Sequence, residues 1–304
     1  MTEEIKKLFG PLYPLLSDEE VGEIAIDSYH EVFVNRVGYW KSEVVFTSPK
    51  QLDEIVEGIR EHFGISEKEG VFSRYLTEVL SVTVIQKPIA LKGASIRIMK
   101  LPKRIFGLED YLKFGAIDKE SKNKIEKILK SNEGIICGGD FGSGKTTLYN
   151  MLINSLPSDI SIVSIEPQAD LVFQRQRVCR LMPRGRESKD INEVIDAASK
   201  AGGDFIGLSF LDEQWTYPYL DMLRNNSNGI TAATGSSPKN VLDRIVRNTV
   251  VSSYGYSLEE ASLLISEVFK YIIFQEKDKD TNIRGISSIC EIKNEDGVLK
   301  VVEI

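Results

Sequence analysis

The chain has 304 residues, of which 42% are hydrophobic and 27% are charged, and its formal net charge is −7. This composition is typical of a folded protein of about two domains, and the acidic balance argues against a general surface for duplex nucleic acid. No segment approaches the ~20 apolar residues that cross a bilayer, and the N-terminus has no apolar run of a secretory signal. We therefore expect a soluble, cytoplasmic protein. Three scattered cysteines predict neither a disulfide framework nor a zinc site.

The first hundred residues predict a small α+β module. A helix is expected to begin near Pro49 and to end at Gly64, because apolar residues recur between them at helical spacing. Before this helix, strands are expected over residues 22–26 and 31–35, with 39–46 returning as a hairpin; after it, alternating apolar and polar residues predict strands over 80–85 and 95–101. A turn is expected at 36–38, and residues 101–107, with Pro102 and Gly107, read as a linker.

From Leu108 onward, helical patterns alternate with short apolar strands. This alternation is typical of a doubly wound parallel sheet. The expected strands of that sheet are residues 134–137, 161–165, 205–211 and 229–234. The last forty residues predict further strands over 271–274, 285–292 and 298–302, as a β-rich edge of the same core.

A phosphate-binding loop of the form G-x-x-x-x-G-K-T follows the first of these apolar strands. It consists of Gly139, Asp140, Phe141, Gly142, Ser143, Gly144, Lys145 and Thr146. In such a loop the glycines let backbone N–H groups surround phosphate oxygens, and the helix that follows presents its positive end to the same anion. Lys145 is expected to reach the β and γ phosphates and the Thr146 hydroxyl to hold Mg²⁺. The loop and the adjacent Thr147 therefore predict a site for ATP with Mg²⁺.

Acidic residues follow two of the predicted parallel strands. Glu166 ends the strand over 161–165, and Asp212 and Glu213 end the strand over 205–211. Carboxylates at the carboxyl ends of parallel strands face the same crevice as a phosphate loop, where they can hold Mg²⁺ through water and orient an attacking water. We expect Glu166 and Glu213 to serve catalysis and Asp212 to serve the metal, although each could instead be a solvated loop acid.

The chain resembles the secretion superfamily ATPases, which drive type II and type IV secretion, type IV pili and archaeal filaments. The resemblance rests on the phosphate loop and on five further segments, residues 10–24, 32–38, 88–93, 108–115 and 284–292. It implies a RecA-like P-loop NTPase core over residues 105–304 and a smaller N-terminal α+β, PAS-like domain with its linker over residues 1–104. It also implies a homo-hexamer that acts at the inner face of the cytoplasmic membrane with a membrane platform protein, and no specific nucleic acid.

The family's acidic boxes are matched only in part. Glu166 falls on the first acid of the Asp box, but Pro167 stands where a second acid is usual. Glu213 falls on the Walker B glutamate, and Asp212 replaces the glycine before it. Counting from Asp204 would instead place Phe210 at the Walker B position. We prefer Glu213, because that register continues into the next helix and a phenylalanine cannot order water.

The chain also differs from the family in its histidines and arginines. No histidine stands in the region of the His box, where Thr234 falls about at the expected position. His30 and His62 are expected to have no catalytic role. Arginines that could reach a γ-phosphate have no firm motif match, and the candidates are Arg74, Arg97, Arg184 and Arg186.

Three functions remain open from the sequence. The first is an Mg-ATP-driven ring motor for secretion or filament assembly, in which ATP hydrolysis could be slow because the boxes diverge. The second is a nucleotide-binding structural or regulatory subunit of the same machinery that has lost fast hydrolysis. The third is a kinase on the same P-loop core, which leaves the N-terminal module unexplained.

Overall fold

The computed structural model describes residues 3–36, 39–101, 104–184, 188–224, 228–252, 255–278 and 283–304. Part of the expected turn at 36–38, Pro102 of the expected linker and the candidate Arg186 lie outside these residues. The chain divides into two compact units. The first consists of Met1–Lys103 together with Gln168–Val172, and the second consists of Arg104–Pro167 and Phe173–Ile304. The first unit therefore includes a short segment from the middle of the sequence.

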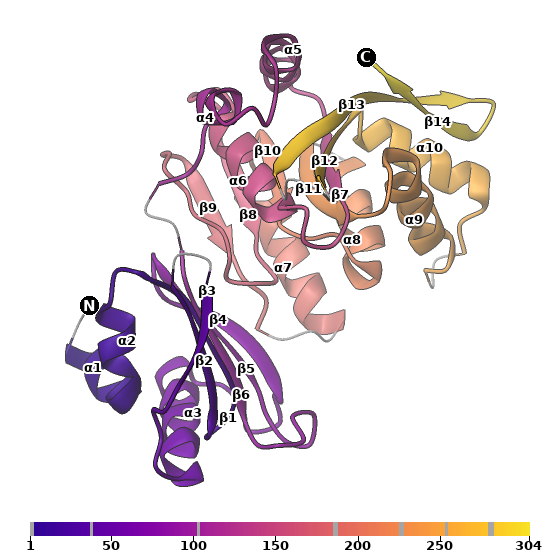
Figure 1. Cartoon of the computed structure of the whole chain (residues 1–304). Coiled ribbons are helices and arrows are strands. Elements are labelled where there is room, and N and C mark those ends of the chain that lie inside the picture. The colour runs from indigo at the N-terminus through magenta and orange to yellow at the C-terminus, as the bar shows by residue number, and fades with distance from the viewer. Residues whose placement is uncertain are drawn as a thin grey trace. The chain divides into compact units, whose positions relative to one another are not determined.

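The first unit contains a six-stranded antiparallel sheet in the order β3-β2-β1-β6-β5-β4 (Figure 1). Its strands are β1 (Val21–Ser28), β2 (Glu31–Arg36), β3 (Tyr39–Glu43), β4 (Val71–Thr77), β5 (Leu80–Ile85) and β6 (Ser95–Lys100). Its helices are α1 (Glu3–Phe9), the 3-10 helix η1 (Gly10–Leu12), α2 (Tyr13–Ser17) and α3 (Pro49–Phe63).

Helix α3 confirms the helix predicted between Pro49 and Gly64. Pro49 occupies its first turn, and Gly64 ends it in the left-handed conformation at φ 62°. The apolar stripe of the helix, which includes Ile55 and Ile59, is buried in one core with β1, β2, β5 and β6. Strand β4 and the short helices before β1 were not predicted.

The segment Gln168–Val172 is held to the first unit by β4. The backbone N–H of Ala169 donates to Ser73 Oγ at 3.2 Å, and the N–H of Leu171 donates to the Tyr75 hydroxyl at 2.8 Å. The same hydroxyl donates to the Leu171 carbonyl at 3.2 Å. Two hydroxyl side chains of one strand thus satisfy backbone groups of a segment that lies about a hundred positions later in the sequence.

The second unit contains an eight-stranded sheet in the order β14-β13-β12-β7-β11-β10-β8-β9. The six strands from β12 to β9 run parallel, and β13 and β14 join the β12 edge antiparallel. The strands are β7 (Ile135–Gly139), β8 (Ile162–Ile165), β9 (Val178–Leu181), β10 (Phe205–Leu208), β11 (Asn228–Thr234), β12 (Tyr271–Lys277), β13 (Arg284–Glu295) and β14 (Val298–Glu303). The predicted parallel sheet with an added β-rich edge is confirmed.

Helices cover both faces of this sheet. Ile206 and Leu208 of β10 share a core with α7, α8, α9 and α10, whereas a Cβ at Gly207 between them would meet Tyr149 and Ile153 of α6. Successive strand residues point to opposite faces, so α6 lies on the face opposite to the other four. The helices are α4 (Leu108–Lys113), α5 (Lys119–Lys130), α6 (Lys145–Ser155), α7 (Ser188–Ala201), α8 (Glu213–Arg224), α9 (Pro238–Val250) and α10 (Leu258–Val268).

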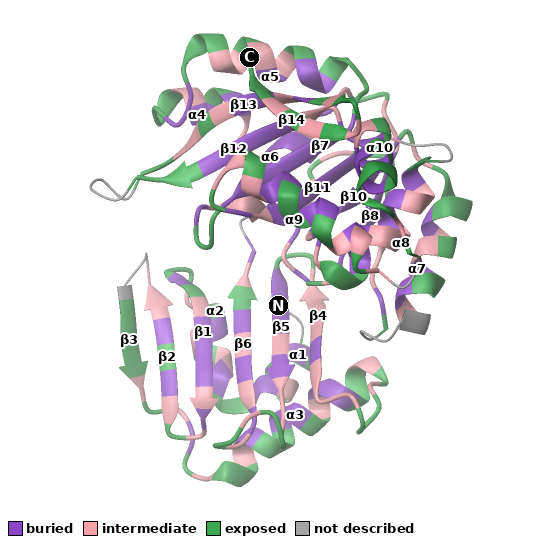
Figure 2. Ribbon diagram, turned by 90° about the vertical axis from the view of Figure 1, so that its right-hand side faces the viewer, coloured by how far each residue is buried: buried purple, intermediate pink, exposed green. Residues whose placement is uncertain are grey.

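The core of the second unit lies along its central parallel strands. Figure 2 shows buried residues along β7, β11 and β12, and every residue of β7, β8 and β10 is buried. Strands buried on both faces read as continuous apolar runs, which explains why these strands were predicted. Among the described residues, no helix has the length and apolarity that a membrane span requires.

Candidate nucleotide site

The phosphate loop joins β7 to α6, as the sequence predicts. Gly142 and Gly144 have φ values of 75° and 92°, a region that other residues rarely adopt. At Gly139 a Cβ would come 2.5 Å from the Gln275 carbonyl oxygen and would also meet the Ser143 hydroxyl. Glycine is therefore required at all three positions for steric reasons. The tip of the loop is open to solvent, with the Phe141 side chain 95% exposed.

Lys145 is turned toward its own loop. Its Nζ donates to the Asp140 carbonyl oxygen at 2.7 Å, and the backbone N–H of Ser143 donates to the same oxygen at 3.2 Å. Partial burial lowers the pKa of the Lys145 ammonium; the charge of Asp140 opposes this effect and the charge of Arg244 adds to it. A phosphate oxygen would offer this ammonium a charged acceptor in place of a neutral carbonyl.

The first turn of α6 carries the two threonines predicted to bind the cofactor. Thr146 is half-buried, and its carbonyl oxygen accepts a hydrogen bond from Asn150 Nδ2 at 3.1 Å, whereas Thr147 is exposed. The side chain of Ser143, just before the helix, is 1% exposed, and its hydroxyl has no hydrogen-bond partner in the described structure. A buried hydroxyl and the positive end of a helix at one loop form an environment that fits a phosphate group.

Two side chains distant in sequence contact the loop and a third holds one of them, and the sequence predicted none of these contacts. Gln275 of β12 donates from Nε2 to the Ser143 carbonyl at 2.7 Å, and the Tyr111 hydroxyl of α4 donates to Gln275 Oε1 at 3.2 Å. Arg284 of β13 donates from Nε to the Gly142 carbonyl at 3.0 Å. The sequence offered one signal for Gln275, which is a polar residue placed directly after the apolar run 271–274.

Strand β11 places Thr234 beside the loop. Thr234 pairs with Gly139 in the sheet, and the N–H of Gly235 donates to the Gly139 carbonyl at 3.1 Å. The position where the His box was expected therefore lies next to the first glycine of the loop. Helix α9 follows this strand and carries Arg244, whose charge acts on Lys145. Arg244 was not among the arginines considered from the sequence.

Glu166 lies at the carboxyl end of β8, as predicted, and is 1% exposed. Its two carboxylate oxygens accept hydrogen bonds from Nε and Nη2 of Arg180 at 2.7 and 2.6 Å. The Arg180 guanidinium also lies 5.3 Å from the centre of the Phe173 ring. Strand β9, which supplies Arg180, was not predicted. The carboxylate is thus already paired within the unit.

Asp212 and Glu213 lie on a helix start and not at a strand end. The prediction that the strand reaches residue 211 is wrong, because β10 ends at Leu208 and Ser209 and Phe210 follow it directly. Asp212 caps α8, since its Oδ1 accepts from the N–H groups of Gln214 at 3.0 Å and Trp215 at 3.2 Å. Glu213 is the exposed first residue of α8.

The candidate arginines and the two histidines make local contacts. In the first unit Arg74 pairs with Glu69 at 3.6 Å, and Arg97 pairs with Asp27 at 2.6 Å. In the second unit Arg184 pairs with Glu193 at 3.5 Å. The histidines bond to neighbours in the first unit, with 3.3 Å between His30 Nδ1 and Ser28 Oγ and 3.0 Å between His62 Nδ1 and Glu4 Oε1.

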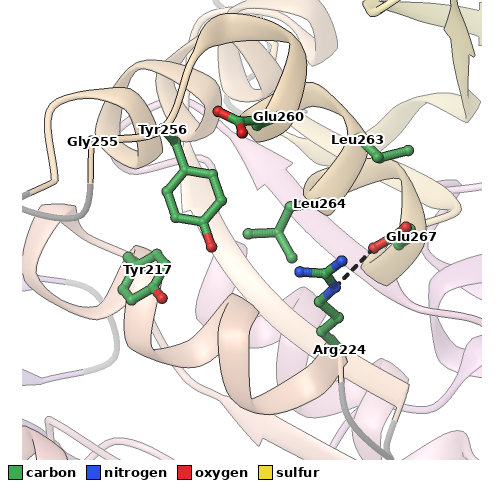
Figure 3. Close-up of a pocket in the computed structure, with 8 residues that line it drawn as sticks. All are labelled: Tyr217, Arg224, Gly255, Tyr256, Glu260, Leu263, Leu264 and Glu267. Atoms are coloured by element: carbon green, nitrogen blue, oxygen red, sulfur yellow. Dashed lines mark ion pairs between the residues drawn. The ribbon is translucent and has the colours of Figure 1, made fainter.

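A separate pocket of about 380 Å³ lies between α8 and α10 (Figure 3). Its lining combines two tyrosines, two leucines, a glycine, Glu260 and the ion pair of Arg224 with Glu267 at 3.3 Å. None of its lining residues belongs to the phosphate loop or to the predicted acids. This pocket is therefore not the candidate nucleotide site.

Comparison with known proteins shows which proteins this chain is similar to. Residues 71–206 match the family model described as type II/IV secretion system protein. The chain is 23% identical to the type IV secretion system protein VirB11 of Bartonella henselae, over 97% of this chain and 90% of that protein.

Two solved structures share the fold across almost the whole chain. The Legionella pneumophila ATPase DotB is 16% identical with a TM-score of 0.64, and the alignment covers 96% of this chain and 81% of DotB. The pilus retraction motor PilT with bound ADP is 14% identical with a TM-score of 0.60, and the alignment covers 97% of this chain and 82% of PilT. The predicted fold class is confirmed: an α/β protein with a RecA-like P-loop core and a smaller N-terminal α+β domain.

Proposed function

We propose that this chain is an ATPase of the type II/IV secretion superfamily, to which its matches point, and that it binds and hydrolyses Mg-ATP to power protein secretion or type IV pilus assembly. It acts as a homo-hexamer at the inner face of the cytoplasmic membrane, together with a membrane platform protein. The observation that carries the proposal is the phosphate loop between β7 and α6, with Lys145 folded into it.

The loop residues would bind the nucleotide through backbone N–H groups and one cation. Gly142 and Gly144 allow the loop to curve, and Lys145 supplies a positive charge. Because the Lys145 side chain is half-buried, solvent and salt screen this charge only in part. Thr146 and Asp212 would hold Mg²⁺, which neutralises charge on the β and γ phosphates. Glu213 would orient the attacking water, with Glu166 as a second acid near the same sheet edge.

A second candidate function is a nucleotide-binding subunit of the same machinery that hydrolyses ATP slowly or not at all. The positions of the acids favour it. Glu166 is held by Arg180, Asp212 caps a helix, and the residues that follow β10 directly are Ser209 and Phe210. A carboxylate that orients water must be within hydrogen-bond reach of that water. The carboxylates of Glu166 and Asp212 already accept hydrogen bonds from the protein, which makes them less able to bind the water.

Calorimetric titration with ATP and Mg²⁺ tests the shared part of both candidates. We expect the purified chain to bind ATP and Lys145→Ala to lose this binding. Lys239→Ala is the matched control, because Lys239 is an exposed lysine on α9 that pairs with Asp243. If the purified chain fails to bind ATP, or if the two alanine variants behave alike, both functions are rejected.

Turnover then separates the two candidates. A motor hydrolyses ATP at a rate well above the Lys145→Ala background, and Glu213→Gln lowers kcat while ATP affinity stays unchanged. ATP binding with turnover equal to that background identifies the slow subunit instead. The hexamer is tested on the same samples by sedimentation with and without nucleotide, where a monomer at all concentrations would contradict it.

A further inference from the structure

Two neighbouring carbonyl groups of the phosphate loop are bound from outside the loop by two adjacent strands. Arg284 Nε donates to the Gly142 carbonyl at 3.0 Å, and Gln275 Nε2 donates to the Ser143 carbonyl at 2.7 Å. Strands β12 and β13 carry these side chains and pair with each other in the sheet. Both contacts therefore come from one pair of hydrogen-bonded strands of the second unit.

Holding these carbonyls also fixes the direction of two N–H groups. A peptide unit is planar and trans, so its C=O and its N–H point in opposite directions. The Gly142 carbonyl shares its peptide unit with the N–H of Ser143, and the Ser143 carbonyl shares its unit with the N–H of Gly144. The Ser143 N–H donates to the Asp140 carbonyl within the loop, so the N–H that the donor on the Ser143 carbonyl directs away from Gln275 is that of Gly144.

The amide of Gln275 is itself oriented by one buried partner. Gln275 is 1% exposed, and its Oε1 accepts from the Tyr111 hydroxyl at 3.2 Å. Because the Ser143 carbonyl can only accept, the amide nitrogen must face the loop, and the amide oxygen is then held by the Tyr111 hydroxyl. Burial raises the pKa of the Tyr111 phenol, so the hydroxyl keeps its proton.

Tyr111 belongs to α4, which is fixed by a separate set of polar contacts. Asp110 accepts from the N–H of Gly107 at 3.0 Å and pairs with Arg104 at 2.6 Å. These contacts hold the helix that carries the phenol in the first residues of the second unit.

We propose that Gln275 is a positioning residue for the phosphate loop and that Tyr111 acts through it, by fixing the Gln275 amide so that it aligns the N–H of Gly144 for phosphate. This role deepens the proposed nucleotide binding and rests on it. Gln275 acts through the loop backbone and does not touch the nucleotide itself.

Calorimetric titrations of the full chain with ADP and with Mg-ATP test the role. We expect Gln275→Leu to weaken affinity about tenfold, because one hydrogen bond to the loop is lost and a buried carbonyl is left unpaired. Tyr111→Phe is expected to weaken affinity about threefold, because the buried amide oxygen loses the hydrogen bond that holds it in place. In the double variant Tyr111→Phe adds nothing further, since its effect passes through Gln275.

The matched control is Tyr219→Phe. Tyr219 is also a buried tyrosine of the second unit, and its hydroxyl donates to the Ile206 carbonyl at 2.6 Å. This variant should lower the melting temperature and leave nucleotide affinity within about twofold. The proposal is overturned if Gln275→Leu binds nucleotide within twofold of the affinity of the unmodified chain. It is also overturned if the losses of affinity from Gln275→Leu and Tyr111→Phe add up in the double variant.

Hydrogen exchange of the loop without nucleotide separates this inference from the proposed function. We expect the peptide that spans residues 140–146 to exchange faster in Gln275→Leu than in the unmodified chain or in Tyr219→Phe. Equal exchange rejects the positioning role even when the chain binds ATP. If Gln275→Leu exchanges faster but the unmodified chain binds no ATP, the contact of Gln275 with the loop is supported and only the proposed nucleotide binding is rejected.

Discussion

The Glu166 carboxylate and the Arg180 guanidinium form two parallel hydrogen bonds, of 2.7 and 2.6 Å. Glu166 is almost completely buried, whereas the Arg180 side chain is 33% exposed. We predict that Arg180→Ala destabilises the protein by about 3 kcal/mol, because removing one partner leaves a buried charge uncompensated. Chemical denaturation measures the change.

The control for this prediction is Arg184→Ala. Arg184 lies just beyond β9 and pairs with Glu193, with both side chains largely exposed. Such a pair contributes about 0–1 kcal/mol, so the variant should unfold nearly as the unmodified chain does. Equal losses for the two variants would show that Glu166 does not depend on Arg180.

Asp212 can serve as a helix cap and as a metal ligand, and two substitutions separate these roles. Asp212→Ala should cost about 1 kcal/mol of stability through loss of the cap on α8, whereas Asp212→Asn should cost little because asparagine caps equally well. If Asp212 also holds Mg²⁺, Asp212→Asn weakens the Mg²⁺ dependence of ATP binding. Unchanged Mg²⁺ dependence would leave Asp212 as a cap only.

Nucleotide affinity should depend on pH through Lys145. Burial lowers the pKa of this ammonium from the ordinary value of 10.5, so the proton is lost at a lower pH than in an exposed lysine. Only the protonated form attracts phosphate, so ATP affinity should fall as pH rises through this lowered pKa. Titrations at pH values from about 7 upward measure the midpoint; a midpoint at or above 10.5 would contradict the prediction.

Gly139→Ala should disrupt the phosphate loop. The added Cβ would lie 2.5 Å from the Gln275 carbonyl oxygen, so backbone must move at a cost of about 1–3 kcal/mol. We expect both the melting temperature and ATP affinity to fall. Gly22→Ala in β1 is the control, because a Cβ there meets nothing within 4 Å. If the two variants melt alike, the close approach at Gly139 carries no cost.

The parts of the fold that the sequence predicted are those with strong local signals. Helix α3 has an apolar stripe between a proline and a left-handed glycine, and the central parallel strands are continuous apolar runs. Strand β9 was missed because its four residues include Cys179 and Arg180, which are exposed and give no apolar run. Strand β4 was missed because only Phe72 of its seven residues is fully buried.

In the candidate site, too, the sequence predicted the part with a local signal and missed the parts that depend on distant residues. The loop from Gly139 to Thr146 was recognised because all its determinants are consecutive. Gln275, Arg284 and Arg244 come from elements roughly a hundred residues or more away, and only the sheet order brings their strands and helix to β7. The end of β10 was placed too late because Leu211 continues the apolar pattern beyond Leu208, the last residue of the strand.

The five residues Gln168–Val172 make the first unit discontinuous in the gene. A fragment that stops at Lys103 would lack the backbone groups that Ser73 and Tyr75 bind, and it would lack Leu171, which is buried. To produce the first unit separately, residues 168–172 would have to be appended to the N-terminal fragment or supplied as a peptide, and one cut between the codons for residues 103 and 104 would not suffice.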